Sequence, residues 1–302
     1  FVQIVFSVFV SAQEPTQALD SLHRAFSKAQ NDTARIVALC SLAERYAIVE
    51  YNDSLGRAKA SEAFHLAERL VMSDFAPLSA YYKAMALQAL GASFRFTAEA
   101  NRPLGEPYFQ AALEEARLIT EPKRSLRMQA SVLSAWFTGL RFRIRTYDKG
   151  DKPLPDLKKE AERLLQDRHE IAEKLNDNAL RGHILLDRAI VLTDSGARRI
   201  LLTTEAVRFY EQSANEEGLA RTLLYLGFFA DRIGDFPRAM EAYKRAVRVL
   251  DSLRLPSRSH AVAYSAIGDI YAKLSDTAQA LAYYERAEPY SEIGRASCRE
   301  RV

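Results

Sequence analysis

Residues 220–246 read ARTLLYLGFFADRIGDFPRAMEAYKRA, and this stretch decides the fold. Its first half carries apolar and small residues at steps of three and four, which is the spacing of one helical face. These residues are Leu223, Leu226, Gly227 and Ala230. A break follows at Gly234-Asp235, a pair typical of turns. The stretch therefore predicts two helices joined by a short connection.

The second of these helices sets one large ring between two small residues. The three positions are Ala239, Tyr243 and Ala246. Two helices that cross closely need this combination, because the ring requires a pocket and a small residue beside it provides one. We therefore expect Leu226, Gly227, Ala239, Tyr243 and Ala246 to form the contact between the two helices.

The same arrangement recurs downstream, 41 residues later when measured from Gly227 to Gly268. A repeated pattern at a fixed step indicates a repeat protein. The second copy consists of Tyr264, Ile267, Gly268, Tyr271, a break at Ser275-Asp276, Ala280, Tyr284 and Ala287. The small, aromatic, small spacing also occurs as Ala60, Phe64 and Ala67 and as Ala206, Tyr210 and Ser213. Looser copies are Gly105, Phe109 and Ala112, and Ala18, Leu22 and Ala25.

The stretch Leu226-Gly227, Ala230, Gly234-Asp235-Phe236, Ala239, Tyr243 and Ala246 resembles the tetratricopeptide repeat signature. This resemblance implies an all-α, right-handed superhelical solenoid of about six helical hairpins. The observed step of 41 is longer than the roughly 34 residues of the minimal repeat, so the helices or the linker through Pro256 must be extended.

Periodicity, start signals such as Asp32-Thr33 and stop signals such as Pro256 predict thirteen helices. They lie near residues 16–29, 33–51, 55–72, 76–98, 104–120, 123–146, 154–175, 178–194, 199–213, 217–233, 236–253, 258–274 and 277–288. Between two of them, residues 148–155 read DKGDKPLP, and one Gly with two Pro forces an irregular loop. This loop either divides the array into two parts or simply joins two helices.

The two chain ends differ from the body. Residues 1–10 are almost wholly apolar and precede Ser11-Ala12, which indicates the remnant of a signal peptide over residues 1–12; a buried first helix is the alternative. Residues 293–302 read IGRASCRERV and resemble one frame of a translated sequencing adapter, so we expect this tail to be artefactual. The solenoid is then expected over residues 13–292, with an exported, periplasmic location in a bacterial envelope.

The composition favours a protein-binding scaffold over a nucleic-acid binder. The formal net charge is +3, and leaving out the tail, with three Arg and one Glu, lowers it to +1. A near-neutral body does not indicate nucleic acid as a partner. Outside the tail Cys40 is the only cysteine, so no internal disulfide is expected and a buried helix face suits it best.

No residue set in the sequence points to catalysis, a cofactor or a metal. His169-Glu170 begins like a zinc-protease motif, but Glu stands at position 173 where that motif has its second His. No glycine-rich phosphate loop, nucleophile elbow or kinase signature occurs. We therefore expect a protein that is not an enzyme.

A stacked array of hairpins presents a concave surface lined by the first helix of each hairpin. In the tetratricopeptide family this inner wall commonly holds a peptide or a helix. Alignment on Gly227 and Gly268 places seven candidate binding residues there: Leu224, Phe228, Asp231, Arg232, Ser265, Asp269 and Lys273. They depart from the Lys and Asn arrangement with which chaperone-binding members hold a terminal carboxylate, so a mixed apolar and charged ligand is expected. The alternative is that Leu224 and Phe228 pack under the next hairpin.

Together these observations favour a scaffold that binds a protein or peptide, as the periplasmic sensory or interaction segment of a larger signalling protein. The resemblance to bacterial envelope sensors suggests a histidine kinase or a transcriptional regulator, with a membrane anchor beyond the C-terminal end of this sequence. A free-standing periplasmic scaffold and the N-terminal region of an enzyme are the alternatives. The sequence leaves the oligomeric state open.

Overall fold

The computed structural model describes residues 15–48, 52–70, 78–94, 105–146, 154–193, 195–253 and 258–299, with backbone alone at 15–18, 48 and 291–299. These residues form thirteen helices and, within the described ranges, no strand. The predicted all-α solenoid of helical hairpins is confirmed. The predicted signal peptide, residues 1–12, lies outside the described residues. None of the described helices is long and apolar enough to cross a membrane.

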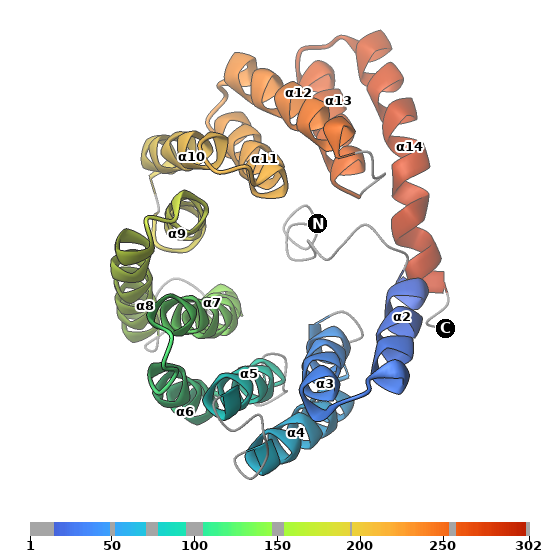
Figure 1. The fold of residues 1–302 in the computed structure, drawn as a ribbon. Helices are drawn as coiled ribbons and strands as arrows, with labels where there is room; N and C mark the ends of the chain where they lie inside the picture. The colour runs from blue at the N-terminus through green and yellow to red at the C-terminus, as the bar shows by residue number, and fades with distance from the viewer. Residues whose placement is uncertain are drawn as a thin grey trace. The chain divides into compact units, whose positions relative to one another are not determined.

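The helices fall into two compact units, Pro15–Asn176 and Asp177–Val302, which we call the N-terminal and C-terminal units. The N-terminal unit contains α2 (Pro15–Lys28), α3 (Asp32–Ile48), α4 (Asp53–Arg69), α5 (Ser79–Ala92), α6 (Glu106–Arg117), α7 (Pro122–Thr146) and α8 (Leu154–Leu175) (Figure 1). The C-terminal unit contains α9 (Asn178–Val191), α10 (Gly196–Glu211), α11 (Glu216–Arg232), α12 (Phe236–Ser252), α13 (Arg258–Lys273) and α14 (Thr277–Arg299).

Each unit is a row of helical hairpins. In the N-terminal unit α3 pairs with α4, α5 with α6 and α7 with α8, while α3 also contacts α5 and α5 contacts α7. Figure 1 shows α3, α5 and α7 along one side of this unit and α4, α6 and α8 along the other. The C-terminal unit repeats the arrangement with α9 and α10, α11 and α12, and α13 and α14. First helices of neighbouring hairpins therefore share one surface within each unit.

The division between the units lies at Asn176–Asp177 and not in the 148–155 segment, where a sub-division was considered. That segment joins α7 to α8, and these two helices pack against each other inside one unit. At the observed division Asn176 has φ 49°, in the left-handed region that Asn tolerates better than most residues. Asp177 then caps the next helix, and its side chain accepts a hydrogen bond from the Leu180 backbone N–H at 2.9 Å.

Asn and Asp begin many of the helices. The side chains of Asn52, Asn215, Asp235 and Asp276 each accept a hydrogen bond from a backbone N–H three residues later. Such a cap satisfies one of the N–H groups that lack a partner in the first turn of a helix. The caps therefore let each of these helices begin at a defined residue after a short connection.

Glycines on the helices of both units receive aromatic rings. A Cβ atom added at Gly227 would lie 2.7 Å from the Tyr243 ring, and one added at Gly91 would lie 2.8 Å from the Phe109 ring. Both rings are almost fully buried, at 3% and 4% exposure. No side chain larger than hydrogen fits at such a position without a shift of the ring.

The packing residues predicted from the sequence are mostly in the core. Buried positions are Leu226, Gly227, Ala239, Tyr243, Ala246, Gly268, Ala280, Ala287, Ala60 and Ala67. Two rings differ from the expectation of full burial, because Phe64 is only half-buried and Tyr284 is 37% exposed. The Tyr284 ring still lies against Gly268, but within the described residues no later helix packs against α14 as α13 packs against α12.

Helix α14 is longer than predicted, since it runs to Arg299 instead of ending near residue 288. Pro289 lies inside it, where it removes one backbone N–H donor without ending the helix. The helix therefore crosses the boundary that the sequence suggests between residues 292 and 293. That the tail 293–302 is artefactual remains a prediction.

Candidate functional site

A groove opens on the shared surface of the first helices in the N-terminal unit. It has a volume of about 670 Å³ and is lined from α3, α5 and α7. The lining residues are Val37, Cys40, Ser41, Glu44, Tyr81, Met85, Gln88, Glu121, Arg124, Arg127, Met128 and Ser131. Three successive hairpins thus contribute one helix each to a single hollow, which is the size of a site for a small molecule or part of a peptide.

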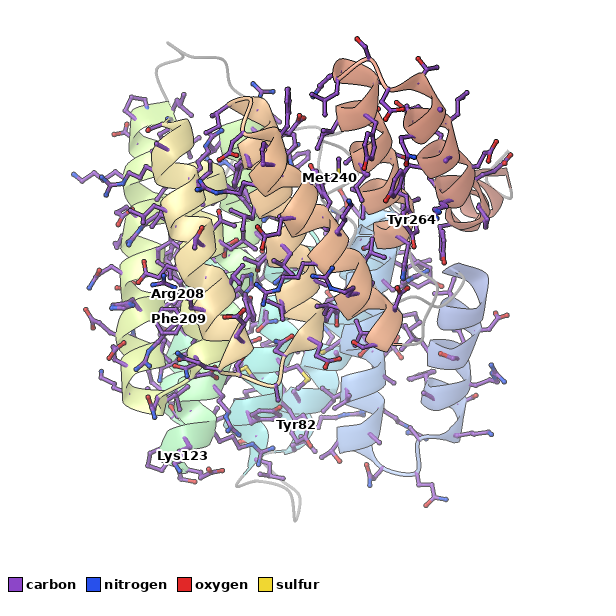
Figure 2. The ribbon with its side chains drawn as sticks, turned by 90° about the horizontal axis from the view of Figure 1, so that it is seen from above. Tyr82, Lys123, Arg208, Phe209, Met240 and Tyr264 are labelled. Carbon is purple, nitrogen blue, oxygen red and sulfur yellow. The ribbon has the colours of Figure 1, made fainter. Side chains whose placement is uncertain are left out.

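Two contacts fix the register between α5 and α7 in this groove. The Arg124 guanidinium lies over the Tyr81 ring, 4.0 Å from its centroid, near the start of both helices. Further along, the Ser131 hydroxyl donates to the Gln88 Oε1 atom at 3.0 Å. Gln88 and Ser131 each lie seven residues after Tyr81 and Arg124 on their helices. Because the two contacts advance by the same number of residues on both helices, α5 and α7 run parallel along the groove. Figure 2 agrees, with the sequence neighbours Tyr82 and Lys123 toward the same side of the view.

The middle of the groove is apolar and adaptable. Met85 on α5 is half-buried and Met128 on α7 is buried, and both thioether side chains can adjust to the shape of a ligand. On α3, Val37 is 42% exposed and lines the groove. These side chains give a bound segment an apolar surface to cover.

Cys40 lies in the groove wall, where it is 5% exposed. Burial raises the pKa of the Cys40 thiol far above its ordinary value, and the carboxylate of Glu44 raises it further. The thiol therefore stays protonated and unreactive at neutral pH. Cys40 contributes to packing and not to chemistry.

The candidate residues predicted on α11 and α13 are largely engaged within the C-terminal unit. Leu224 is 0% exposed, so its prediction as a binding residue is wrong; it packs in the core, as the alternative held. Phe228 is half-buried and packs against the same core, and the Arg232 guanidinium lies 5.9 Å from its ring centroid. Met240 and Tyr264, labelled in Figure 2, pack against this core from α12 and α13.

Two charged candidates do come together across neighbouring hairpins. The Lys273 ammonium of α13 contacts both carboxylate oxygens of Asp231 on α11, at 2.6 and 2.7 Å. On the last hairpin, the Tyr284 hydroxyl donates to the Asp269 carboxylate at 2.8 Å. Ser265 is half-buried on α13. These residues tie helices to one another, and a ligand would have to compete with those contacts.

The described residues do not assemble a metal-binding constellation. No group of three or more His, Cys, Asp or Glu within the described ranges is placed to hold a metal ion. The histidines lie on separate helices; His169 is exposed on α8, and His260 lies 3.2 Å from Asp251 in a local pair. The groove is thus equipped for recognition by shape, apolar contact and charge.

Sequence reasoning missed the groove because it looked only at the two clearest repeats. The structure shows the equivalence that was missed, since Gly91 receives the Phe109 ring as Gly227 receives Tyr243. The offset that places Leu224 three residues before Gly227 places Gln88 three residues before Gly91. Following the same helical face backwards at steps of three and four reaches Met85 and Tyr81, which are groove residues.

A family model and one solved structure agree with this architecture. The tetratricopeptide repeat family model matches residues 218–292. Among solved structures, BtubC (BKLC) from P. vanneervenii is similar with a TM-score of 0.62 and 17% sequence identity, over 79% of this chain and 91% of that chain. The apo form of RapI aligns with a TM-score of 0.42 and 10% identity, over 94% of this chain and all of the other. No curated protein is similar enough in sequence to count as a relative.

The fold and the first-helix groove define the class of the molecule, which is a helical-repeat scaffold. Its C-terminal hairpins match the tetratricopeptide repeat model over residues 218–292, and the chain shares a helical-repeat fold with BtubC. Repeats of this family indicate a scaffold for protein–protein interaction, and their fold is typically non-catalytic.

Proposed function

We propose that this protein binds a segment of a partner protein in the groove of α3, α5 and α7, as the exported sensory or interaction segment of a signalling protein. The observation that carries the proposal is the lining of the groove, where three successive first helices combine two Met side chains, one exposed Val and four charged residues. The sequence predicted a mixed apolar and charged binding surface on α11 and α13, whereas this mixed surface lies on α3, α5 and α7.

The exported setting is supported by the sequence alone. The apolar run of residues 1–10 followed by Ser11-Ala12 has the composition of a signal peptide. In this setting, binding along the groove would alter the packing between neighbouring hairpins, since a solenoid has contacts only between neighbours. Fractionation of source cells with an antibody against the chain checks the location; recovery from the cytosol alone would contradict it.

The binding role can be tested with a photo-crosslinking amino acid at Ser41, which lines the groove. A matched probe at Ser54, exposed on α4 outside the groove lining, serves as the control. We expect the probe at Ser41 to crosslink one defined partner in cells and the probe at Ser54 to give no such product.

Bulky substitutions at the same two positions test whether filling the groove prevents partner binding. Ser41→Trp fills part of the groove and is expected to abolish partner binding, while Ser54→Trp leaves binding unchanged. Circular dichroism melting verifies that both variants remain folded. Partner binding that survives Ser41→Trp in a folded protein would exclude the groove as the binding site.

A further inference from the structure

Arg124 is held in the groove by an aromatic ring. Its guanidinium carbon lies over the Tyr81 ring, 4.0 Å from the centroid. A guanidinium stacked on a ring keeps its N–H donors directed outward in its own plane, so the ring orients the group without using those donors. Stacking therefore prepares Arg124 to hold a planar, bidentate acceptor.

Arg127 follows Arg124 by one helical turn and is exposed in the same groove. Within the described residues, neither guanidinium forms an ion pair with a carboxylate. Two carboxylates also line the groove, Glu121 just before α7 and Glu44 across the hollow on α3. Elsewhere on α7, Arg143 forms an ion pair with Glu106 at 2.7 Å. Arg124 and Arg127 form no such pair in the part of the chain that the structure describes.

A carboxylate is the acceptor that matches this arrangement. It takes two parallel N–H bonds from one guanidinium, and these charge-assisted bonds are about twice as strong as neutral ones. Met85 and Met128 lie in the same groove and offer an apolar surface next to the cations. The cations and the adjacent Met side chains therefore fit a bound segment that has an acidic side chain beside a flexible apolar one.

We propose that Arg124, stacked on Tyr81, and Arg127 form a carboxylate-binding subsite that selects partner segments with an Asp or Glu side chain beside an unbranched apolar residue. This inference rests on the proposed function of the groove. Arg127 is exposed, so a bound chain can continue past it into solvent. We therefore assign the carboxylate to a side chain within the segment, and the test below separates it from a chain end.

The test uses fluorescein-labelled dodecapeptide pools and the full chain, with affinity measured by fluorescence anisotropy. All pools share two fixed Met positions and random flanks, and they differ at one position between the Met residues, which is Glu, Gln or Lys. These three pools have amidated C-termini. A fourth pool has Gln at that position and a free C-terminal carboxylate.

We expect the Glu pool to bind about tenfold more tightly than the Gln pool at low salt, with the Lys pool weakest. Arg124→Gln and Arg127→Gln should each reduce binding of the Glu pool and leave the Gln pool unchanged. Lys123→Gln is the matched control, since it removes one exposed cation from the same helix outside the groove lining. It should leave all pools unchanged.

Two further variants separate orientation from charge. Arg124→Lys keeps the positive charge but not the planar fork, and Tyr81→Leu removes the ring that orients it. Both are expected to lose most of the preference for Glu over Gln. In Arg127→Glu, the preference should shift towards the Lys pool. Unchanged melting temperatures verify that each variant is folded.

The outcomes distinguish the subsite from the groove. Equal binding of the Glu and Gln pools, both weakened by Ser41→Trp, would overturn the carboxylate subsite and leave the proposed function standing. Preference for the free-carboxylate pool would overturn the choice of a side-chain carboxylate. Binding of no pool by the wild-type chain would contradict both the subsite and the groove as a peptide site.

Discussion

The two units use the same packing device but differ in what their sequences reveal. In the C-terminal unit, Gly227 and Tyr243 belong to a recognisable repeat signature, and the family model matches residues 218–292. In the N-terminal unit, Gly91 and Phe109 make an equivalent contact within a stretch that has only a loose copy of the pattern. The groove nevertheless lies in the N-terminal unit.

This difference shows that the signature of a repeat records its packing and not where a groove opens. Signature residues are buried between helices, where size and shape constrain them strongly. Groove residues need only suit a ligand, so their identities vary from one repeat to the next. A clear signature therefore indicates where hairpins stack well, while the binding residues must be located from the structure.

The largest expected effects test whether the two units are packed alike. Tyr243→Ala and Phe109→Ala should each lower the free energy of unfolding by about 3–5 kcal/mol, the range for deleting a buried aromatic ring. Urea melts followed by circular dichroism measure both losses. The single tryptophan, Trp136, stacks on Phe109 at 5.9 Å between centroids, so its fluorescence reports on the N-terminal unit. A loss below about 1 kcal/mol at Phe109 would show that the loose copy is not a true equivalent.

A smaller effect is expected at Tyr284, which has the same signature position as Tyr243 but is 37% exposed. Tyr284→Ala should cost about 1–2 kcal/mol, since less apolar surface is returned to water and the hydrogen bond to Asp269 lies at the surface. The same urea melts check it. A cost equal to that of Tyr243→Ala would mean that another part of the protein covers this ring.

The turns of the two C-terminal hairpins offer a paired test of backbone strain. Gly234 has φ +82°, and at the equivalent turn Ser275 has φ 62°. Gly234→Ser should destabilise the unit by about 1 kcal/mol, and Ser275→Gly should stabilise it by up to about 1 kcal/mol, because glycine enters the left-handed region without steric cost. Thermal melts of the two variants should shift in opposite directions. A shift in the same direction would contradict the equivalence of the two turns.

The smallest effect concerns the pair between Lys273 and Asp231. Lys273→Ala should cost less than about 1 kcal/mol, because the ammonium side chain is 46% exposed and the pair is screened by water and salt. Raising the salt concentration should reduce the difference between wild type and variant in urea melts. A cost that is large and independent of salt would indicate that this face is a packed contact and not an exposed ion pair.

Much of the fold could be predicted because helix periodicity and turn chemistry are local properties. Each of the thirteen expected helices has a counterpart, and Asn or Asp caps several of their starts. The end of α14 was predicted wrongly, since the sequence placed it near residue 288 and the helix continues through Pro289 to Arg299. Burial of Leu224 was also misjudged, because its helical face could equally point to the concave side or to the next hairpin.

The sequence by itself determined that the chain forms helical hairpins in which small residues receive aromatic rings, because a period of 3.6 residues and the fit of a ring against Gly or Ala can be read within one repeat. Only the tertiary structure decided which first-helix residues share a surface. The groove joins Val37, Tyr81 and Arg124 across three hairpins, and their register depends on how whole helices stack. Contacts between residues more than forty positions apart leave no local pattern, so the groove became visible only once the helices were placed.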